Sequence, residues 1–310
     1  MFGWTAAVVL FLSQDIAWQK SWPEALKEAK ASKKLAMLVF SNGGVRDCVF
    51  FEKETLTNVQ VIAALRQYVC VRIDPEGSDA DNKLWQDHKM PPLPTAYVFD
   101  PEGKMLMLIS SISARGFAGA LEAAGPAYFQ KIQPAREALA KDPNQPEKLV
   151  LLGEAYAQLD SPTESAKAYE KAVDLLSRKG DKGGALKHIE AQISKFYTLK
   201  WYGHARRACQ QLQELDPGDG TKLGAMGAWL VGMADCADYR WNDAITGMRA
   251  ACEKYKDAKN LDQMMFTLGS SYMYAKDKDN AIAVFEQIIK QFPDSESARI
   301  AQVQVDKLKK

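Results

Sequence analysis

The side chains of this 310-residue chain that could carry redox or metal chemistry are its five cysteines and three histidines. The cysteines form no CxxC or CxxH pair, and no histidine lies close to a cysteine in the sequence. A zinc site needs such ligands at short, regular spacings, and a disulfide framework needs an even, patterned set of cysteines. We therefore expect no metal, no cofactor and no disulfide framework. The residues concerned are Cys48, Cys70, Cys209, Cys236, Cys252, His88, His188 and His204.

Cys48 is the thiol whose position suggests a reaction. It follows an apolar, strand-like run and a glycine-rich loop, at the point where a helical pattern begins. A helix N-terminus stabilises a thiolate, so Cys48 could act as a single nucleophilic thiol or as a peroxide sensor. Arg46 would favour that thiolate, and Asp47 would oppose it. The alternative is a buried cysteine that only fills space, as cysteines without a partner commonly do.

Several classes of function lack their sequence signals. There is no GxSxG, no phosphate-binding glycine loop and no HExxH motif. The 40 basic side chains are balanced by 39 acidic ones, so no net field attracts nucleic acid or an anionic membrane. Asp74 and Asp100 are expected to be solvated or turn-forming carboxylates. We expect no nucleic-acid partner.

The N-terminal run Thr5–Leu12 is apolar and too short to span a bilayer. It fits the core of a secretory signal ending near Ala17, but no lysine or arginine precedes it, and Asp15 stands where a small residue is wanted. It equally fits a short strand or helix that packs onto the first domain. Export and retention in the cytoplasm both stay open, and no transmembrane span is expected.

The first 125 residues alternate helical and strand patterns, which predicts a mixed sheet covered on both faces by helices. The last two strands are expected to form an antiparallel hairpin around the turn 100–103. Predicted helices cover 22–33, 47–68 with an interruption near Thr57, 81–88 and 117–124. Predicted strands cover 35–40, 69–74, 96–99 and 105–109.

This order of elements resembles thioredoxin over about residues 17–125. The likeness rests on a strand followed by a cysteine-bearing loop that opens a helix, on a second strand ending in Asp74, and on Pro94-Thr95 before the hairpin. In that family a cis proline faces the active cysteines. The resemblance therefore implies a cis peptide bond between Leu93 and Pro94, beside Cys48.

The resemblance also implies that the thiol site lacks the first cysteine of the redox motif. Thioredoxin-like oxidoreductases carry Trp-Cys-x-x-Cys, in which the first cysteine attacks and the second resolves. The corresponding positions here are Gly44, Val45 and Cys48. Because valine cannot form the mixed disulfide, dithiol–disulfide oxidoreductase activity is not expected.

Beyond residue 125 every pattern is helical, with a helical linker over 126–146 and repeats over 147–310. The repeats, about four helix pairs, resemble the tetratricopeptide (TPR) pattern, whose glycine lets two helices approach closely. The resemblance implies an all-α TPR solenoid after the α/β thioredoxin-like domain. The positions that fit are Leu268, Gly269, Tyr272, Ala281, Phe285 and Pro293, and the same frame fits Leu152, Gly153, Tyr156, Ser165, Tyr169 and Ala172. A looser copy has Val231, Gly232, Ala244, Met248 and Ala251, and a degenerate fourth copy has Ala205.

The spacing of the repeats exceeds the usual 34 residues. The small residues Ser165, Ala205, Ala244 and Ala281 are 40, 39 and 37 positions apart. We therefore expect the turns between helices to be longer than in the consensus repeat.

The first helices of the better repeats are expected to line an apolar concave groove. Lysines and asparagines that would clamp a charged C-terminus are absent there, so methionines and aromatics favour an amphipathic helix or hydrophobic segment of a partner protein. Alternatively, these side chains pack against neighbouring helices or the first domain. The predicted groove residues are Met226, Trp229, Met233, Phe266, Met273 and Tyr274.

The sequence thus favours a non-catalytic interaction or scaffold protein that recruits a protein partner through its repeats. One alternative is a monothiol thioredoxin-like oxidoreductase or redox sensor that uses Cys48. Another is a chaperone-like holdase that binds unfolded clients.

Overall fold

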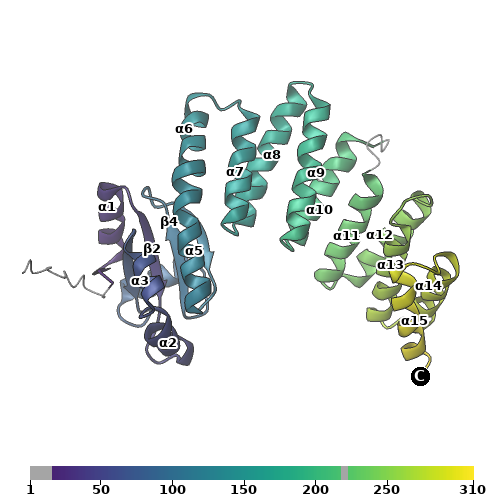
Figure 1. Cartoon of the computed structure of the whole chain (residues 1–310), viewed down its shortest axis with the longest axis horizontal. Helices are drawn as coiled ribbons and strands as arrows, with labels where there is room; N and C mark the ends of the chain where they lie inside the picture. The colour runs from purple at the N-terminus through teal and green to yellow at the C-terminus, as the bar shows by residue number, and fades with distance from the viewer. Residues whose placement is uncertain (1–15, 218–222) are drawn as a thin grey trace, which may run out of the picture. The chain divides into compact units, whose positions relative to one another are not determined.

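The computed structural model describes residues 16–217 and 223–310, so the run Thr5–Leu12 lies outside the described part (Figure 1). The chain divides into two compact units. The first comprises residues up to Pro143 together with Leu151–Ser165, and the second comprises Asn144–Val150 together with Ala166–Lys310.

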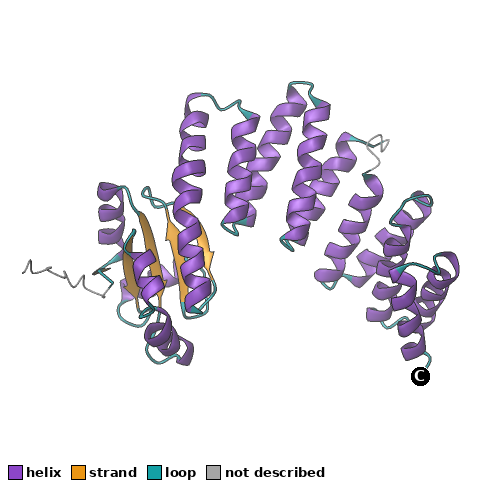
Figure 2. Ribbon diagram, in the orientation of Figure 1, coloured by secondary structure: helices purple, strands orange, loops and turns teal. Residues whose placement is uncertain are grey.

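A mixed five-stranded sheet forms the centre of the first unit (Figure 2). The strand order is β1-β3-β2-β4-β5, in which β1, β3 and β2 are parallel and β4 and β5 continue antiparallel. All four predicted strands and the hairpin are confirmed. The two-residue β1 was not predicted, because so short a strand shows no alternating pattern. The strands are β1 (Trp18–Gln19), β2 (Leu35–Phe40), β3 (Tyr68–Ile73), β4 (Thr95–Phe99) and β5 (Met105–Ile109).

Helices cover both faces of this sheet, as the sequence predicted. One face packs against α1 (Trp22–Ser32) and α4 (Asp79–Asp87), where alternate residues of β2 join a core with Ala25 and Ala29. The other side carries α3 (Val59–Leu65) and α5 (Ala114–Pro126), which contact each other and the strands β3 and β5. β2 is buried along its whole length because it lies at the centre of the sheet between these layers.

The predicted helix 47–68 is divided into three pieces. These are α2 (Arg46–Phe50), the π-helical segment η1 (Phe51–Thr55) and α3, with the break at residues 56–58. Asn58 caps α3 by accepting a hydrogen bond from the Gln60 amide, which explains why a new helix starts there.

One helical run continues from α5 (Ala114–Pro126) through the π-helical segment η2 (Ala127–Ile132) into α6 (Gln133–Lys141). The sequence predicted a helical linker over 126–146, with a helix over about 127–140 that is separate from the preceding helix. Here a π-helical segment directly follows Pro126, and the helix continues without a break. Tyr128 and Ile132 are buried, so the expected linker is part of the core of the first unit.

The remaining helices follow one another in antiparallel pairs joined by short turns (Figure 1). Among the described residues, no helix is both long enough and apolar enough to cross a bilayer. The helices are α7 (Pro146–Gln158), α8 (Pro162–Arg178), α9 (Lys182–Thr198), α10 (Tyr202–Leu215), α11 (Gly224–Ala237), α12 (Trp241–Lys254), α13 (Leu261–Tyr274), α14 (Lys278–Gln291) and α15 (Glu296–Leu308).

The predicted close approach of paired helices is confirmed at two glycines. A Cβ atom placed on Gly232 of α11 would lie 2.6 Å from the Met248 side chain of α12. A Cβ atom on Gly269 of α13 would lie 2.7 Å from the ring of Phe285 on α14. Because real Cβ contacts are longer than this, each glycine is needed where a large side chain of the second helix crosses the first.

The long repeat spacing has two structural origins. Between Ser165 and Ala205 the extra residues lie inside helices, because α8 and α9 have 17 residues each. The connection there, 179–181, is short, so the prediction of longer turns is wrong for that repeat. The other two spacings do arise from longer connections, which run from α10 to α11 and from α12 to α13.

Tight turns within the pairs share one backbone feature. The central residue of each has a positive φ, and none of these four residues is glycine. A left-handed conformation costs a non-glycine residue about 1–2 kcal/mol. The residues are Asp160 (φ 49°), Lys200 (φ 60°), Tyr239 (φ 59°) and Lys276 (φ 64°).

Candidate functional site

The loop before Cys48 is built around the side chain of Asn42. Its Oδ1 accepts a hydrogen bond from the Gly44 amide at 2.7 Å, and its Nδ2 donates to Asp74 Oδ1 at 3.0 Å. The Asn42 carbonyl also accepts from the Val45 amide at 3.0 Å. These bonds fix the loop between β2 and α2. Asp74 begins the turn that follows β3, where its carbonyl accepts a hydrogen bond from the Gly77 amide.

Cys48 itself is inaccessible. Its exposed fraction is 0%, whereas Val45, at the position of the usual first cysteine, is 36% exposed. The peptide bond between Leu93 and Pro94 is cis. A thiolate must reach its substrate to attack it, and the exposed position of this loop carries no thiol. As arranged, the loop places no nucleophile at the surface.

The other cysteines are poor nucleophiles for an electrostatic reason. Burial raises the pKa of the Cys70 thiol and of the Cys209 thiol to about 12, and that of Cys252 to about 11. Burial also raises the pKa of Cys236, although a hydrogen bond with Ser271 opposes the shift. Among the described residues, no group of three or more potential ligands could hold a metal ion.

A concavity of the second unit lies on α11, α13 and α15, and we call it the repeat groove. It is a cavity of about 810 Å³, large enough for several side chains of a ligand. Its wall is mainly aromatic and apolar. The lining residues are Tyr202, Trp229, Met233, Cys236, Ala237, Tyr239, Trp241, Asp262, Gln263, Phe266, Thr267, Ser270, Tyr274, Glu296, Ser297 and Ile300.

In the middle of the repeat groove, a hydrogen bond connects α11 to α13. The indole Nε1 of Trp229 donates a hydrogen bond to Thr267 Oγ1 at 3.0 Å, and Met233 Sδ lies 3.6 Å from the same oxygen. Phe266 packs on Phe285, with 5.5 Å between ring centroids. These side chains therefore belong partly to the core and form the fixed floor of the groove.

One end of the repeat groove is an exposed aromatic cluster. The rings of Trp241 and Tyr274 stack with centroids 4.9 Å apart and an interplanar angle of 19°. Tyr239 meets Trp241 edge-on at 5.8 Å. Tyr239 is 79% exposed and Tyr274 is 59% exposed, so their rings are available to a ligand.

The opposite end of α13 is acidic. Asp262 lies in the first turn of α13, and Glu296 lies in the first turn of α15. Both line the repeat groove, and none of the lining residues is a lysine or arginine. Within the described part of the chain, neither carboxylate forms an ion pair.

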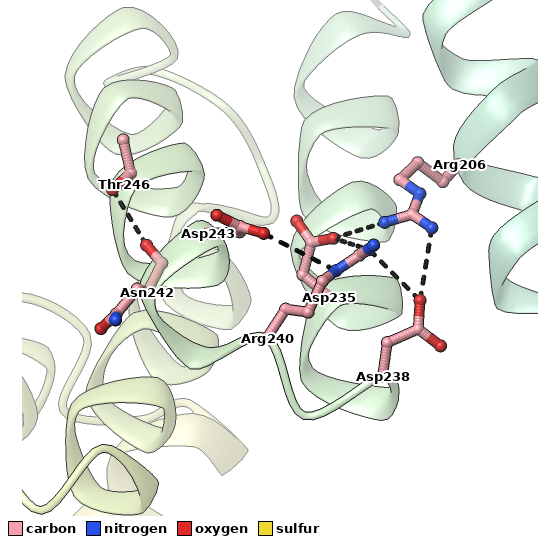
Figure 3. A network of polar contacts seen from close by, with 7 residues as sticks. All are labelled: Arg206, Asp235, Asp238, Arg240, Asn242, Asp243 and Thr246. Carbon is pink, nitrogen blue, oxygen red and sulfur yellow. Dashed lines mark hydrogen bonds and ion pairs between the residues drawn. The ribbon is translucent and has the colours of Figure 1, made fainter.

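A charged network supports the turn that presents Tyr239. Figure 3 shows Arg206 and Arg240 directed toward the carboxylates of Asp235 and Asp238. Arg206 contacts Asp235 at 2.7 Å and Asp238 at 3.3 Å, and Arg240 pairs with both carboxylates. Burial raises the pKa of Asp235, and Arg206 opposes that shift. Since Asp238 and Arg240 flank Tyr239, the network fixes the aromatic end of the groove.

The structure brings together four of the six predicted groove residues. Trp229, Met233, Phe266 and Tyr274 line the cavity. Met226 is exposed on α11, one turn before Trp229, and does not line it.

Met273 does not line the cavity either. It is rotated by about 100° around α13 from its neighbour Tyr274 and packs against the core.

Other residues line the repeat groove that were not predicted from the sequence, above all Tyr239, Trp241, Asp262, Glu296 and Ile300. A signal existed for Asp262, because it continues the four-residue spacing of Phe266, Ser270 and Tyr274 on one helix face. No comparable pattern marks Tyr239, whose position depends on the conformation of a turn.

Comparisons with known proteins agree with this architecture. A family model described as thioredoxin-like matches residues 17–101. Two tetratricopeptide-repeat models match residues 149–176 and 263–295. Among curated proteins, none matches the chain.

One similar solved structure is the crystal structure of YrrB, described as a TPR protein with an unusual peptide-binding site. It is 16% identical, with a TM-score of 0.31, and the match covers 54% of this chain and 97% of that chain.

Taken together, the sheet of the first unit, the paired helices of the second and the family matches identify a thioredoxin-like domain followed by tetratricopeptide repeats.

Proposed function

We propose that this protein is a non-catalytic interaction protein that binds an apolar segment of a partner protein in the repeat groove. The observation that carries the proposal is the exposed aromatic cluster at the end of an apolar cavity, made by Tyr239, Trp241 and Tyr274. Exposed apolar concavities with aromatic residues are typical of protein-binding surfaces, where tyrosine and tryptophan carry much of the binding energy.

The backbone at Tyr239 supports the same proposal. The equivalent positive-φ positions in three other turns are occupied by Asp160, Lys200 and Lys276, which are polar. A bulky aromatic residue in a left-handed conformation is unfavourable, and such residues concentrate at binding and catalytic sites. Here the conformation, held by the charged network, presents the Tyr239 ring to solvent beside Trp241.

The thioredoxin-like domain is, on this proposal, a docking or structural module. The burial of Cys48 and the exposed valine at position 45 support this role. The burial of Cys48 also disfavours the alternative of a monothiol oxidoreductase or redox sensor, which needs an accessible thiol.

Peptide selection on the full-length protein tests the proposal. A phage-displayed library of random dodecapeptides would be selected against the wild type, and the affinity of selected peptides measured by fluorescence polarisation. Tyr274→Ala and Ile300→Ala remove exposed lining side chains and should weaken binding at least fivefold, about 1 kcal/mol. Met226→Ala removes an exposed side chain of α11 outside the cavity, and is the matched control that should bind normally.

Exposed side chains are preferred for this test because Trp229 and Phe266 also pack in the core. Substituting those two would confuse loss of binding with loss of folding. If the selected peptides bind Tyr274→Ala and Ile300→Ala as tightly as wild type, or if no peptide is selected, the repeat groove is not the binding site.

A further inference from the structure

We propose that the occupant of the repeat groove is a protein segment with a lysine or arginine at one end, bound by Asp262 and Glu296, and apolar side chains at the other, in contact with Trp241 and Tyr274. This inference rests on the proposed function and specifies the chemistry of the partner.

The charges of the lining residues indicate a cationic ligand. Two carboxylates line the groove, and the set contains no basic side chain. Since neither carboxylate forms an ion pair within the described residues, a ligand cation would not have to displace an existing partner. Complementary charge of this kind selects partners and excludes acidic ones.

The aromatic rings favour the same sign of charge. The face of a tryptophan or tyrosine ring attracts a cation and repels an anion. An acidic segment would therefore be disfavoured along the whole groove, by carboxylates at one end and by ring faces at the other.

The groove also has a direction. Arg240, Asp243 and Lys276 line the neighbouring cavity beyond the aromatic end, and Arg240 is paired there with Asp235 and Asp238. Because no lysine or arginine lines the repeat groove beside Asp262 and Glu296, a ligand cation is attracted most strongly to the first turns of α13 and α15. The basic residue of the ligand should consequently lie at the Asp262 end.

The length of α13 sets the spacing within the ligand. Asp262 and Tyr274 are twelve residues apart on one helix, which corresponds to about 18 Å. A ligand that reaches both ends needs about five or six residues in an extended conformation, or about twelve in a helix. A dodecapeptide is long enough for either.

A charge-reversal experiment tests this inference. The same dodecapeptide library would be selected against wild-type protein and against the double variant Asp262→Lys/Glu296→Lys. Wild type should enrich peptides with lysine or arginine near one end and apolar residues elsewhere. Those peptides should bind the double variant roughly tenfold more weakly, and their binding to wild type should weaken as salt rises.

The matched control is Asp279→Lys/Asp294→Lys, which makes the same charge change. Asp279 lies in the first turn of α14 and Asp294 just before α15, both exposed and outside the groove. If this control binds the peptides normally, the loss of affinity in the charge-reversed variant is due to the lining carboxylates.

The outcomes separate the two proposals. Peptides that lose affinity for Tyr274→Ala but carry no basic residue, or bind the charge-reversed protein equally well, would overturn the charge inference and leave the groove as the binding site. Equal loss in the control variant would also overturn it, because the effect would then come from net charge. Peptides unaffected by Tyr274→Ala would overturn the proposed function itself.

Discussion

At the scale of single residues, Tyr239 combines an unfavourable backbone conformation with an exposed aromatic ring. The residue adopts φ 59° and leaves most of its ring exposed, which contributes little to the stability of the fold. Its ring does, however, extend the aromatic end of the groove. A ligand contact is the physical reason we propose for tolerating this conformation.

Tyr239→Gly should therefore separate stability from binding. Glycine removes about 1 kcal/mol of strain from the left-handed backbone, and this gain offsets the loss of the edge-on contact with Trp241. The free energy of unfolding in urea should therefore be unchanged or higher. Peptide affinity should fall. Lys200→Gly makes the same backbone change outside the groove and should raise stability without altering affinity. A Tyr239→Gly protein that binds as tightly as wild type would contradict this role.

The cysteines give a second prediction at this scale. Because Cys48 is buried and burial raises the pKa of Cys70 and Cys209, these three thiols should react slowly with iodoacetamide in the native protein. All five cysteines should react after unfolding in urea, as peptide mass spectrometry would show. Rapid alkylation of Cys48 near pH 6 in the native protein would instead support the redox alternative.

At the scale of elements, the glycines of the helix pairs define the packing of the repeats. Gly269→Ala should lower the free energy of unfolding by about 1–3 kcal/mol, because the added methyl group meets the Phe285 ring. Gly247 lies inside α12 with open space around it, so Gly247→Ala is the matched control. That control should raise stability by about 0.5–1 kcal/mol. Equal effects of the two substitutions would mean that Gly269 does not determine the packing.

Elements with a long regular pattern could be predicted from the sequence, and those that depend on local geometry could not. The apolar run of β2 and the turn of the β4–β5 hairpin were sufficient to predict the sheet. The continuous run through η2 was not predicted, because Pro126 is locally a helix stop, whereas the structure continues from it directly into a π-helical segment.

The same distinction applies to the candidate site. Trp229 and Met233 lie four residues apart on one first helix, and Phe266 and Tyr274 lie eight apart on another, so the sequence indicates which helix face each pair shares. Tyr239 and Trp241 reach the groove from a turn and from the start of a second helix. Their arrangement follows from a left-handed residue and a network of arginines, and neither is visible as a pattern.

At the scale of the whole molecule, the first unit extends beyond the thioredoxin-like match into α6. The carboxylate of Asp100 accepts hydrogen bonds from the amides of Glu102 and Lys104 and pairs with Arg136 of α6 at 2.5 Å. Arg136 also donates to the hydroxyl of Tyr156 at 2.5 Å. The Asp100 side chain is only 1% exposed, so this pair connects the hairpin turn to α6 in the interior.

Arg136→Ala should consequently destabilise the hairpin as well as α6. The buried carboxylate would lose its charged partner, at a cost of about 2–4 kcal/mol. Hydrogen exchange should accelerate over both β4–β5 and α6. Lys131→Ala removes an exposed contact with Gln158 and should change exchange little. Faster exchange confined to α6 would mean that the pair does not couple the two elements.

Binding of a partner segment in the repeat groove can be observed by methyl NMR of the methionines. Met233 lines the groove, whereas Met226 lies on the same helix outside it. On titration with a library-selected peptide, we expect the Met233 methyl resonance to shift and broaden and the Met226 methyl resonance to stay unchanged. An unmoved Met233 resonance at saturating peptide, or an equal shift at Met226, would contradict the claim.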